Sequence, residues 1–403
     1  MSRAFLIVMD SVGIGGAPDA ADFGPRDITD EGSNTLGHIA QECAAGRATQ
    51  GRDGPLSLPV LDGLGLGAAL RLASGLAAPG LGAEPQGLWG AATEVSAGKD
   101  TPSGHWEMAG VPVPWDWHFF PDTRPTFPPE VTARICELAG TEGILGNEHA
   151  SGTEIIDRLG KEHQRSGWPI CYTSTDSVLQ IAAHEDSFGL DRLIALCRDL
   201  APMLHQMRVG RVIARPFTGT PGHYQRTANR RDFAVEAPGE TLLDRAQAAG
   251  VTTHAIGKIG DIFSHRGIDH LHKGKSDADL AAHLVRLGRE AADNSLIFAN
   301  FVEFDSLYGH RRDVSGYARA LEWFDGVAGQ LLAVLRPGDL AIFTADHGND
   351  PTWAGTDHTR ERVPVIGWGL GPRPVGQVAF ADIGASIGAH LGLAAPRHGV
   401  SFL

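Results

Sequence analysis

Three apolar runs in this 403-residue chain each lead to an aspartate: "AFLIVMD" ends at Asp10, "SLIFANFVEFD" at Asp305, and "LAIFTADH" contains Asp346. Continuous apolar runs of this kind are typical of strands that are buried on both faces of a parallel sheet. Such sheets bind ligands beyond the carboxyl ends of their strands. We therefore expect the three aspartates to converge on one point. The alternative for each is a role as a helix cap or turn residue.

Composition narrows the class of protein. Apolar residues make up 42% of the chain and charged residues 20%, which predicts a globular protein. The net charge of -14 argues against nucleic acid or an anionic membrane as a partner, because either would need a basic surface. The four cysteines show no Cys-x-x-Cys spacing, which favours reduced thiols. The first apolar run is too short for a signal peptide or membrane span, so a cytoplasmic location is expected.

Helical and strand patterns alternate on both sides of a central segment, which indicates an α/β fold. Residues 112–128 hold five prolines and read as a rigid linker, and residues 218–231 read as a second linker. The prediction is a core domain at 1–115 and 230–403, with a mainly parallel sheet flanked by helices. A smaller α+β cap domain is predicted as an insertion at 116–229.

Six side chains near the predicted strand ends could bind metal: Asp10, Asp305, His310, Asp346, His347 and His358. Oxygen and nitrogen donors without sulfur suit Mn²⁺, Zn²⁺ or Mg²⁺, and six donors suffice for two ions. Two ions about 4 Å apart can hold both the attacking and the leaving oxygen of a phosphoryl transfer. His310 and His358 could instead be polar loop residues, but two Asp-His pairs beside a buried strand end favour the metal site.

A candidate nucleophile lies in "AGKDTPSGHWEMAG", where Thr101 follows a glycine-rich turn. A hydroxyl that contacts a divalent cation has a lowered pKa and can attack phosphorus. From spacing alone Ser103 is an equal candidate, and an ordinary turn is the third reading.

Together these segments resemble the phosphopentomutase branch of the alkaline phosphatase superfamily. The resemblance covers nearly the whole chain, from residue 10 to residue 361. It rests on seven segments in the expected order: "DSVGIGGAPDA", "KDTPSGHWEMAG", "YTSTDSVLQIAAHE", "GRVIARPFTGTPGHYQRT", "GKIGDIF", "FDSLYGHRRD" and "TADHGNDPTWAGTDHTRE".

The resemblance implies a role for each candidate. Thr101, in preference to Ser103, would carry the phosphoryl group. One metal would be held by the residues matching Asp10, Asp346 and His347, together with the threonine oxygen. The other would be held by those matching Asp305, His310 and His358. Asp357 would then orient His358 or shape its loop.

The resemblance also implies a reaction, in which (deoxy)ribose 1-phosphate and (deoxy)ribose 5-phosphate interconvert through a phosphothreonine and a 1,5-bisphosphate. Two Mn²⁺ ions are the expected cofactors, with other divalent metals left open. A sugar bisphosphate such as glucose 1,6-bisphosphate or ribose 1,5-bisphosphate would prime the enzyme. The cap would exclude water that could hydrolyse the phosphothreonine.

Five residues are candidates for contacts with the sugar phosphate. In "GRVIARPF" the strand period of two puts Arg211 and Arg215 on one face, and arginine suits bidentate phosphate contacts. Ser174 and Asp176 could bond sugar hydroxyls, and Lys258 is a further phosphate candidate. The alternative for each is an ordinary surface position.

Two rival functions remain. A metal-dependent phosphomonoesterase or a cofactor-independent phosphoglycerate mutase would share the metals, although relatives in the phosphoglycerate branch use serine where this chain has Thr101. A binding protein that has lost catalysis would not be expected to keep all six ligands and the threonine. The sequence leaves open the ribose preference and the oligomeric state, and a monomer is compatible with it.

Overall fold

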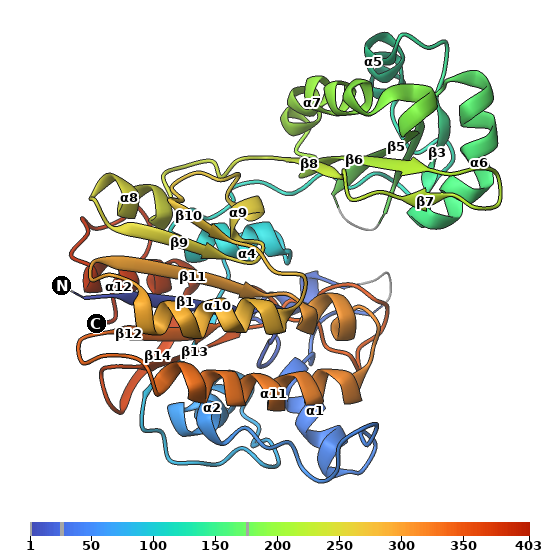
Figure 1. Ribbon diagram of the computed structural model, residues 1–403. Helices are drawn as coiled ribbons and strands as arrows, with labels where there is room; N and C mark the ends of the chain where they lie inside the picture. Colours follow the sequence, from blue (N-terminus) through green and yellow to red (C-terminus); the bar gives the residue numbers. More distant parts are fainter. Residues whose placement is uncertain (1, 25–27, 175–176) are drawn as a thin grey trace. The chain divides into compact units, whose positions relative to one another are not determined.

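The computed structural model describes residues 2–24, 28–174 and 177–403. The chain divides into two compact units, one formed by Met1–Pro114 with Ala237–Leu403 and the other by Trp115–Glu236. Each unit has its own sheet (Figure 1). The smaller unit is thus an insertion in the larger one.

The larger unit begins and ends the chain. Its elements are β1 (Ala4–Met9), the 3-10 turn η1 (Ala20–Asp22), α1 (Thr35–Ala44), α2 (Pro59–Leu64), α3 (Leu66–Ser74), β2 (Leu88–Thr93), α4 (Thr101–Met108), α8 (Leu242–Ala248), β9 (Thr252–Ile256), α9 (Ile259–Ile262), β10 (His270–His272), α10 (Asp277–Glu290), β11 (Ser295–Phe301), the π-helical turn η3 (Phe304–Gly309), α11 (Val314–Leu332), β12 (Leu340–Thr344), β13 (Val363–Trp368), β14 (Arg373–Ala379) and α12 (Phe380–His390).

The sheet of this unit has the strand order β10-β9-β11-β1-β12-β13-β2-β14. The strands from β10 to β12 are all parallel, and only the pairs that involve β13 are antiparallel. Every residue of β1, β11 and β12 is buried, which explains why these runs are apolar throughout and do not alternate. The predicted α/β fold with a mainly parallel sheet is confirmed.

Helices cover both faces of this sheet. In Figure 1, α10 and α11 lie on one face, whereas α4, α8 and α12 lie on the other. α11 shows why the sequence folds this way: Tyr317, Leu321, Phe324, Ala328 and Leu331 recur at helical spacing and are all buried. Helices thus cover both faces of the sheet, and the carboxyl ends of its central strands are where a ligand is expected.

The smaller unit has a mixed sheet with the order β3-β4-β5-β6-β7, and β8 also pairs with β6. Helices α5 and α7 pack over a separate apolar core that includes strands β5 and β6. Its elements are α5 (Pro129–Ala139), β3 (Leu145–His149), α6 (Gly152–Ser166), β4 (Ile170–Thr173), β5 (Val178–His184), the π-helical turn η2 (Glu185–Gly189), α7 (Leu190–Gln206), β6 (Arg211–Thr218), β7 (Gln225–Arg226) and β8 (Arg231–Ala234).

The second expected linker is wrong in part. Residues 218–231 do not lead out of the smaller unit, because β7 and β8 both pair antiparallel with β6. Main-chain hydrogen bonds made by short polar strands hold this segment in the sheet, and they leave little trace in the pattern of hydrophobic residues.

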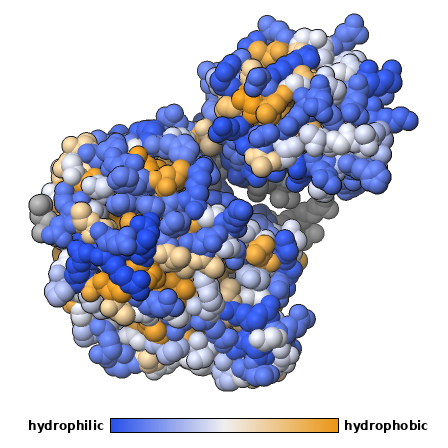
Figure 2. All heavy atoms as spheres, in the orientation of Figure 1, coloured by the Kyte–Doolittle hydropathy of each residue, from blue (hydrophilic) through white to orange (hydrophobic). Residues whose placement is uncertain are grey.

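Hydrophilic residues predominate on the face drawn in Figure 2, and apolar residues appear there as separate patches. Among the described helices, none is long and apolar enough to cross a membrane. All four cysteines are free thiols, and three of them are buried.

Candidate metal centre

The central strands of the larger sheet lead two carboxylates to the same point. β1 is parallel to both β11 and β12, with Met9 opposite Phe301. Asp10 follows β1 directly, and Asp346 comes two residues after β12. Both side chains are completely buried. The parallel register alone therefore places two acidic groups, 336 residues apart, beside each other.

The third aspartate reaches this point by a different route. The strand expected to run to Asp305 ends at Phe301, and Asp305 lies in the π-helical turn η3. The main-chain N–H of His310 donates to the carbonyl of Asp305 at 3.0 Å, five residues back. This wider turn puts both side chains on one side, with His310 Nε2 3.1 Å from Asp305 Oδ2.

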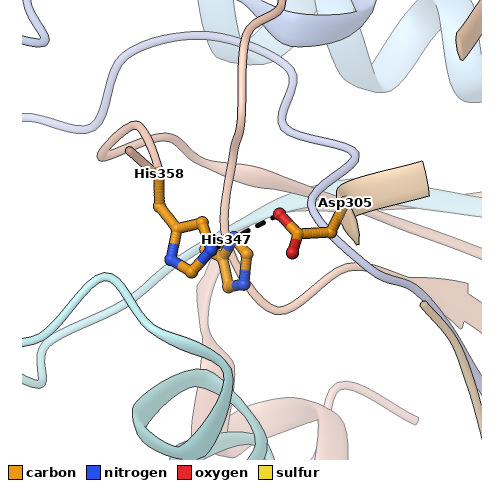
Figure 3. Close-up of side chains that lie close together, drawn as sticks. All are labelled: Asp305, His347 and His358. Atoms are coloured by element: carbon orange, nitrogen blue, oxygen red, sulfur yellow. Dashed lines mark ion pairs between the residues drawn. The ribbon is translucent and has the colours of Figure 1, made fainter. Parts of the chain in front are cut away.

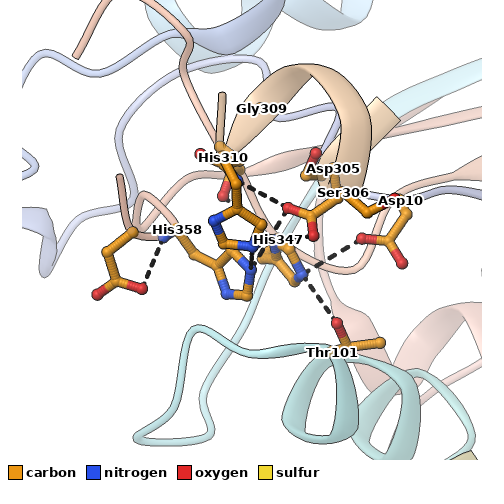
Figure 4. A network of polar contacts seen from close by, with 12 residues as sticks. Asp10, Thr101, Asp305, Ser306, Gly309, His310, His347 and His358 are labelled. Carbon is orange, nitrogen blue, oxygen red and sulfur yellow. Dashed lines mark hydrogen bonds and ion pairs between the residues drawn. The ribbon is translucent and has the colours of Figure 1, made fainter. Parts of the chain in front are cut away.

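One group of donors consists of Asp10, Asp346 and His347. His347 Nε2 lies 3.5 Å from Asp10 Oδ1 and 3.4 Å from Asp346 Oδ2. The hydroxyl of Thr101 lies 3.3 Å from the same nitrogen (Figure 4). The three side chains offer ligand atoms that all lie within 4.8 Å of one another.

A second group adjoins the first. His358 Nε2 lies 3.4 Å from Asp305 Oδ1 and 3.2 Å from His310 Nε2. The rings of His347 and His358 stack with their centroids 3.9 Å apart (Figure 3). His347 therefore lies where the two groups meet.

The main chain sets which nitrogen of each histidine faces the centre. Nδ1 of His310, His347 and His358 contacts the carbonyl oxygens of Thr356, Gly348 and Lys99, respectively, at 2.6, 3.1 and 2.9 Å. A carbonyl can only accept, so each Nδ1 carries the hydrogen and each neutral ring presents a lone pair at Nε2. Each Nε2 lone pair thus lies beside at least one of the three carboxylates, so the centre is rich in acceptor atoms.

The buried carboxylates and neutral imidazole of this centre would be stabilised by a positive charge placed between them. Burial, together with the carboxylates of Asp346 and Asp305, raises the pKa of Asp10 well above its usual range. Burial lowers the pKa of His347 to about 4, although Asp346 opposes this, so the ring is neutral at pH 7. Within the described residues, Asp10 Oδ1 and Asp346 Oδ2 accept no hydrogen bond. Carboxylate and imidazole donors arranged in this way fit divalent cations.

Amide groups hold the other carboxylate oxygens. Asn300 donates to Asp10 Oδ2 at 2.9 Å, and Asn349 donates to Asp305 Oδ1 at 2.7 Å. Asp346 Oδ1 accepts from the main-chain N–H of Ser11 at 3.1 Å. Sequence reasoning missed both asparagines. Asn300 had a visible signal, because it is the one amide in the apolar strand β11.

Two hydroxyls were candidates for the nucleophile, and the structure places them differently. Thr101 opens α4 and its Oγ1 faces His347. Ser103 is fully buried, and its hydroxyl donates to the capping carboxylate of Asp100 at 3.0 Å. His105, which we did not single out, has Nδ1 2.9 Å from the carbonyl of Thr101. Of the two hydroxyls, the one at Thr101 is therefore the one beside the acceptor groups.

Of the two roles expected for Asp357, orienting His358 or shaping its loop, the contacts favour the second. Asp357 Oδ1 accepts from the main-chain N–H of His358 at 2.8 Å, and its Oδ2 lies 3.6 Å from Lys99 Nζ. The ring is held instead by the carbonyl of Lys99. Asp357 therefore shapes the loop that carries His358.

The expected sugar phosphate contacts lie in both units. Arg211 and Arg215 are half-buried on β6, and Arg215 Nε donates to Gln180 Oε1 at 3.0 Å. Ser174 is half-buried after β4, whereas Asp176 lies outside the described residues. Lys258 belongs to the larger unit, is exposed, and acts electrostatically to lower the pKa of Asp10 against the larger effect of burial.

The chain matches the model of the metalloenzyme superfamily over residues 2–395. It is also similar to curated phosphopentomutases over its whole length. Identity is 56% over 411 residues with the phosphopentomutase of Rhizobium rhizogenes, covering 100% of both chains. It is 57% over 409 residues with that of Chelativorans sp., covering 100% of this chain and 98% of the relative.

Proposed function

Because the chain belongs to the phosphopentomutase family of the metalloenzyme superfamily, we propose that it interconverts the 1-phosphates and 5-phosphates of ribose and deoxyribose. The enzyme is an isomerase that moves a phosphoryl group within its substrate. The observation that carries the proposal is the position of Thr101, whose Oγ1 lies 3.3 Å from Nε2 of His347, the histidine that lies where the two donor groups meet.

Thr101 is proposed to carry the phosphoryl group. The sugar monophosphate attacks the phosphothreonine, so that a new P–O bond to the sugar forms as the bond to Thr101 Oγ1 breaks. The sugar hydroxyl loses one proton and the threonine oxygen gains one, so the step is balanced. The resulting 1,5-bisphosphate turns round and returns its other phosphoryl group to Thr101. A bisphosphate primer, glucose 1,6-bisphosphate or ribose 1,5-bisphosphate, loads the first phosphoryl group.

Two divalent cations, with Mn²⁺ as the proposed ion, would neutralise the charge that spreads over the transferring phosphoryl group and lower the pKa of the Thr101 hydroxyl. The proposed ligands of one are Asp10, Asp346 and His347, and those of the other are Asp305, His310 and His358. Asn300 and Asn349 each donate to one oxygen of Asp10 and Asp305, respectively, and so orient these two carboxylates.

The smaller unit, Trp115–Glu236, is proposed to act as the cap domain that was expected at residues 116–229. There Arg211, Arg215, Ser174 and Asp176 would contact the distal phosphate and the sugar hydroxyls, and from the larger unit Lys258 would contribute a further cation. Arginine suits this role because its planar guanidinium can make two parallel bonds to a phosphate. A cap that excludes water protects the phosphothreonine from hydrolysis.

A mutase assay tests the proposed function. Ribose 1-phosphate is supplied with Mn²⁺ and a catalytic amount of glucose 1,6-bisphosphate, and ribose 5-phosphate is measured against released inorganic phosphate. We expect ribose 5-phosphate to form with little free phosphate. Release of phosphate without isomerisation would identify a phosphomonoesterase, and turnover of phosphoglycerate in place of the pentose would identify a phosphoglycerate mutase.

Arg211→Ala tests the role of the smaller unit. Loss of a charge-assisted contact should weaken binding of the sugar phosphate by about 1.5–3 kcal/mol. The retained bisphosphate should also escape more often, so that hydrolysis rises relative to isomerisation. The measurements are the KM for ribose 1-phosphate and the ratio of inorganic phosphate to ribose 5-phosphate.

Arg198→Ala is the matched control, since Arg198 lies on α7 of the same unit with 61% of its side chain exposed and pairs with Asp199. It should change neither quantity. If Arg211→Ala behaves like this control, Arg211 does not contact the substrate.

A further inference from the structure

Four histidines gather at the edge of the larger sheet, away from the residues assigned to the metal centre. The edge strand β10 is parallel to β9, with His270 opposite His254. Side chains two residues apart share a face, so His272 lies on the same face as these two. α10 contributes His283, whose ring centroid is 5.5 Å from that of His272.

The rings are in contact as a row. The centroids of His270 and His254 are 4.8 Å apart, and those of His254 and His272 are 5.4 Å apart, with interplanar angles of 24° and 23°. His254 Nδ1 lies 3.1 Å from His272 Nε2. Two nitrogens on one tetrahedral zinc ion, with Zn–N distances of 2.0–2.1 Å, stand about 3.3 Å apart. The distance between His254 Nδ1 and His272 Nε2 is therefore already close to the distance between two nitrogen ligands of one zinc ion.

Arg286 determines where the protons are. Its Nη2 lies 3.5 Å from His272 Nδ1 and 3.4 Å from His283 Nδ1. A guanidinium only donates, so both Nδ1 atoms accept, and neutral His272 carries its hydrogen on Nε2. That hydrogen lies between His272 Nε2 and His254 Nδ1. A divalent cation between these two nitrogens would bind the lone pair of His254 Nδ1. It would bind His272 Nε2 once the hydrogen of that ring moves to Nδ1 and displaces Arg286, with no net loss of a proton.

We propose that His254, His272 and His270 form a second metal site, selective for a borderline transition metal such as Zn²⁺, Ni²⁺ or Cu²⁺. Imidazole donors without a carboxylate favour these ions over Mn²⁺ and Mg²⁺. His270 is exposed, and its ring can turn on the edge strand to supply the third nitrogen, with water completing the coordination. The site shares no residue with the proposed catalytic ligands and does not depend on the proposed reaction.

Binding of Ni²⁺ tests the site. The tag-free, full-length protein is first saturated with Mn²⁺ and then titrated with Ni²⁺ by calorimetry, with bound nickel counted by elemental analysis after gel filtration. We expect the wild type to bind one Ni²⁺ per chain more than His272→Gln. Exchange of nickel into the catalytic centre would affect both proteins equally, so the difference isolates the new site.

Two further variants complete the test. His265→Gln is the matched control, because His265 is an exposed histidine of the same unit, and it should bind as much nickel as the wild type. His270→Gln changes an exposed side chain, so it remains informative if His272→Gln fails to fold, and it should bind the extra ion more weakly. Equal nickel content in wild type, His272→Gln and His270→Gln would overturn the proposal, as would an equal loss in His265→Gln.

Discussion

Thr101→Ala is expected to remove mutase activity, with kcat falling by at least about four orders of magnitude, as when a covalent nucleophile is deleted. Alanine lacks the oxygen that would carry the phosphoryl group. Alanine also favours a helix, and the cap of α4 is made by Asp100, so the turn should remain intact. The mutase assay measures the loss, and circular dichroism checks the fold.

Mass spectrometry of the active protein determines whether Thr101 or Ser103 carries the phosphate. Phosphate should be found on Thr101 after incubation with the bisphosphate primer, and Ser103→Ala should retain it. The Ser103 hydroxyl is bonded to Asp100, so its removal should cost stability in the cap but not phosphorylation. Phosphate on Ser103, or turnover by Thr101→Ala, would show that the nucleophile was assigned wrongly.

Removal of divalent metal should abolish activity completely. Without cations, the buried carboxylates of Asp10, Asp305 and Asp346 face one another and the lone pairs of three histidines. Mn²⁺ should restore turnover better than Ca²⁺, because Ca²⁺ prefers more oxygen ligands at longer distances. Activity is measured after dialysis against a chelator and again after each metal is added.

Substitution of a proposed metal ligand tests whether this loss of activity comes from the proposed metal centre. His310→Gln should lower both the manganese content and the turnover, whereas His265→Gln should leave both unchanged. Elemental analysis accompanies each assay. Full activity in wild-type protein that contains no metal after exhaustive chelation would exclude the two-metal centre.

The convergence of Asp10, Asp305 and Asp346 could be predicted because it depends on one rule, that parallel strands end at the same edge of a sheet. The rule needed no knowledge of the turns. It was less accurate for Asp305, since nothing in "VEFDSLYGH" distinguishes a π-helical turn from the end of a strand. The spacing of five residues to His310 is understandable only once that turn is seen.

The supporting contacts could not be predicted in the same way. Asn300 and Asp10 are 290 residues apart, and their bond exists only because β11 and β1 are neighbours. The carbonyl of Lys99 holds His358 from a distance of 259 residues. Main-chain groups carry no signal in a sequence, because every residue has them. For that reason the sequence could not decide between the two roles expected for Asp357.

The position of β1 has a consequence for biosynthesis. Among the described strands, this first strand pairs with β11 and β12 alone, whose residues lie between Ser295 and Thr344. β1 is synthesised first and cannot pair until both of its partner strands have left the ribosome. The inserted unit at Trp115–Glu236 has its own core and can fold in the meantime. The last of the proposed ligands in the chain, His358, emerges after both partner strands, so we expect metal loading to be one of the last steps in the maturation of the protein.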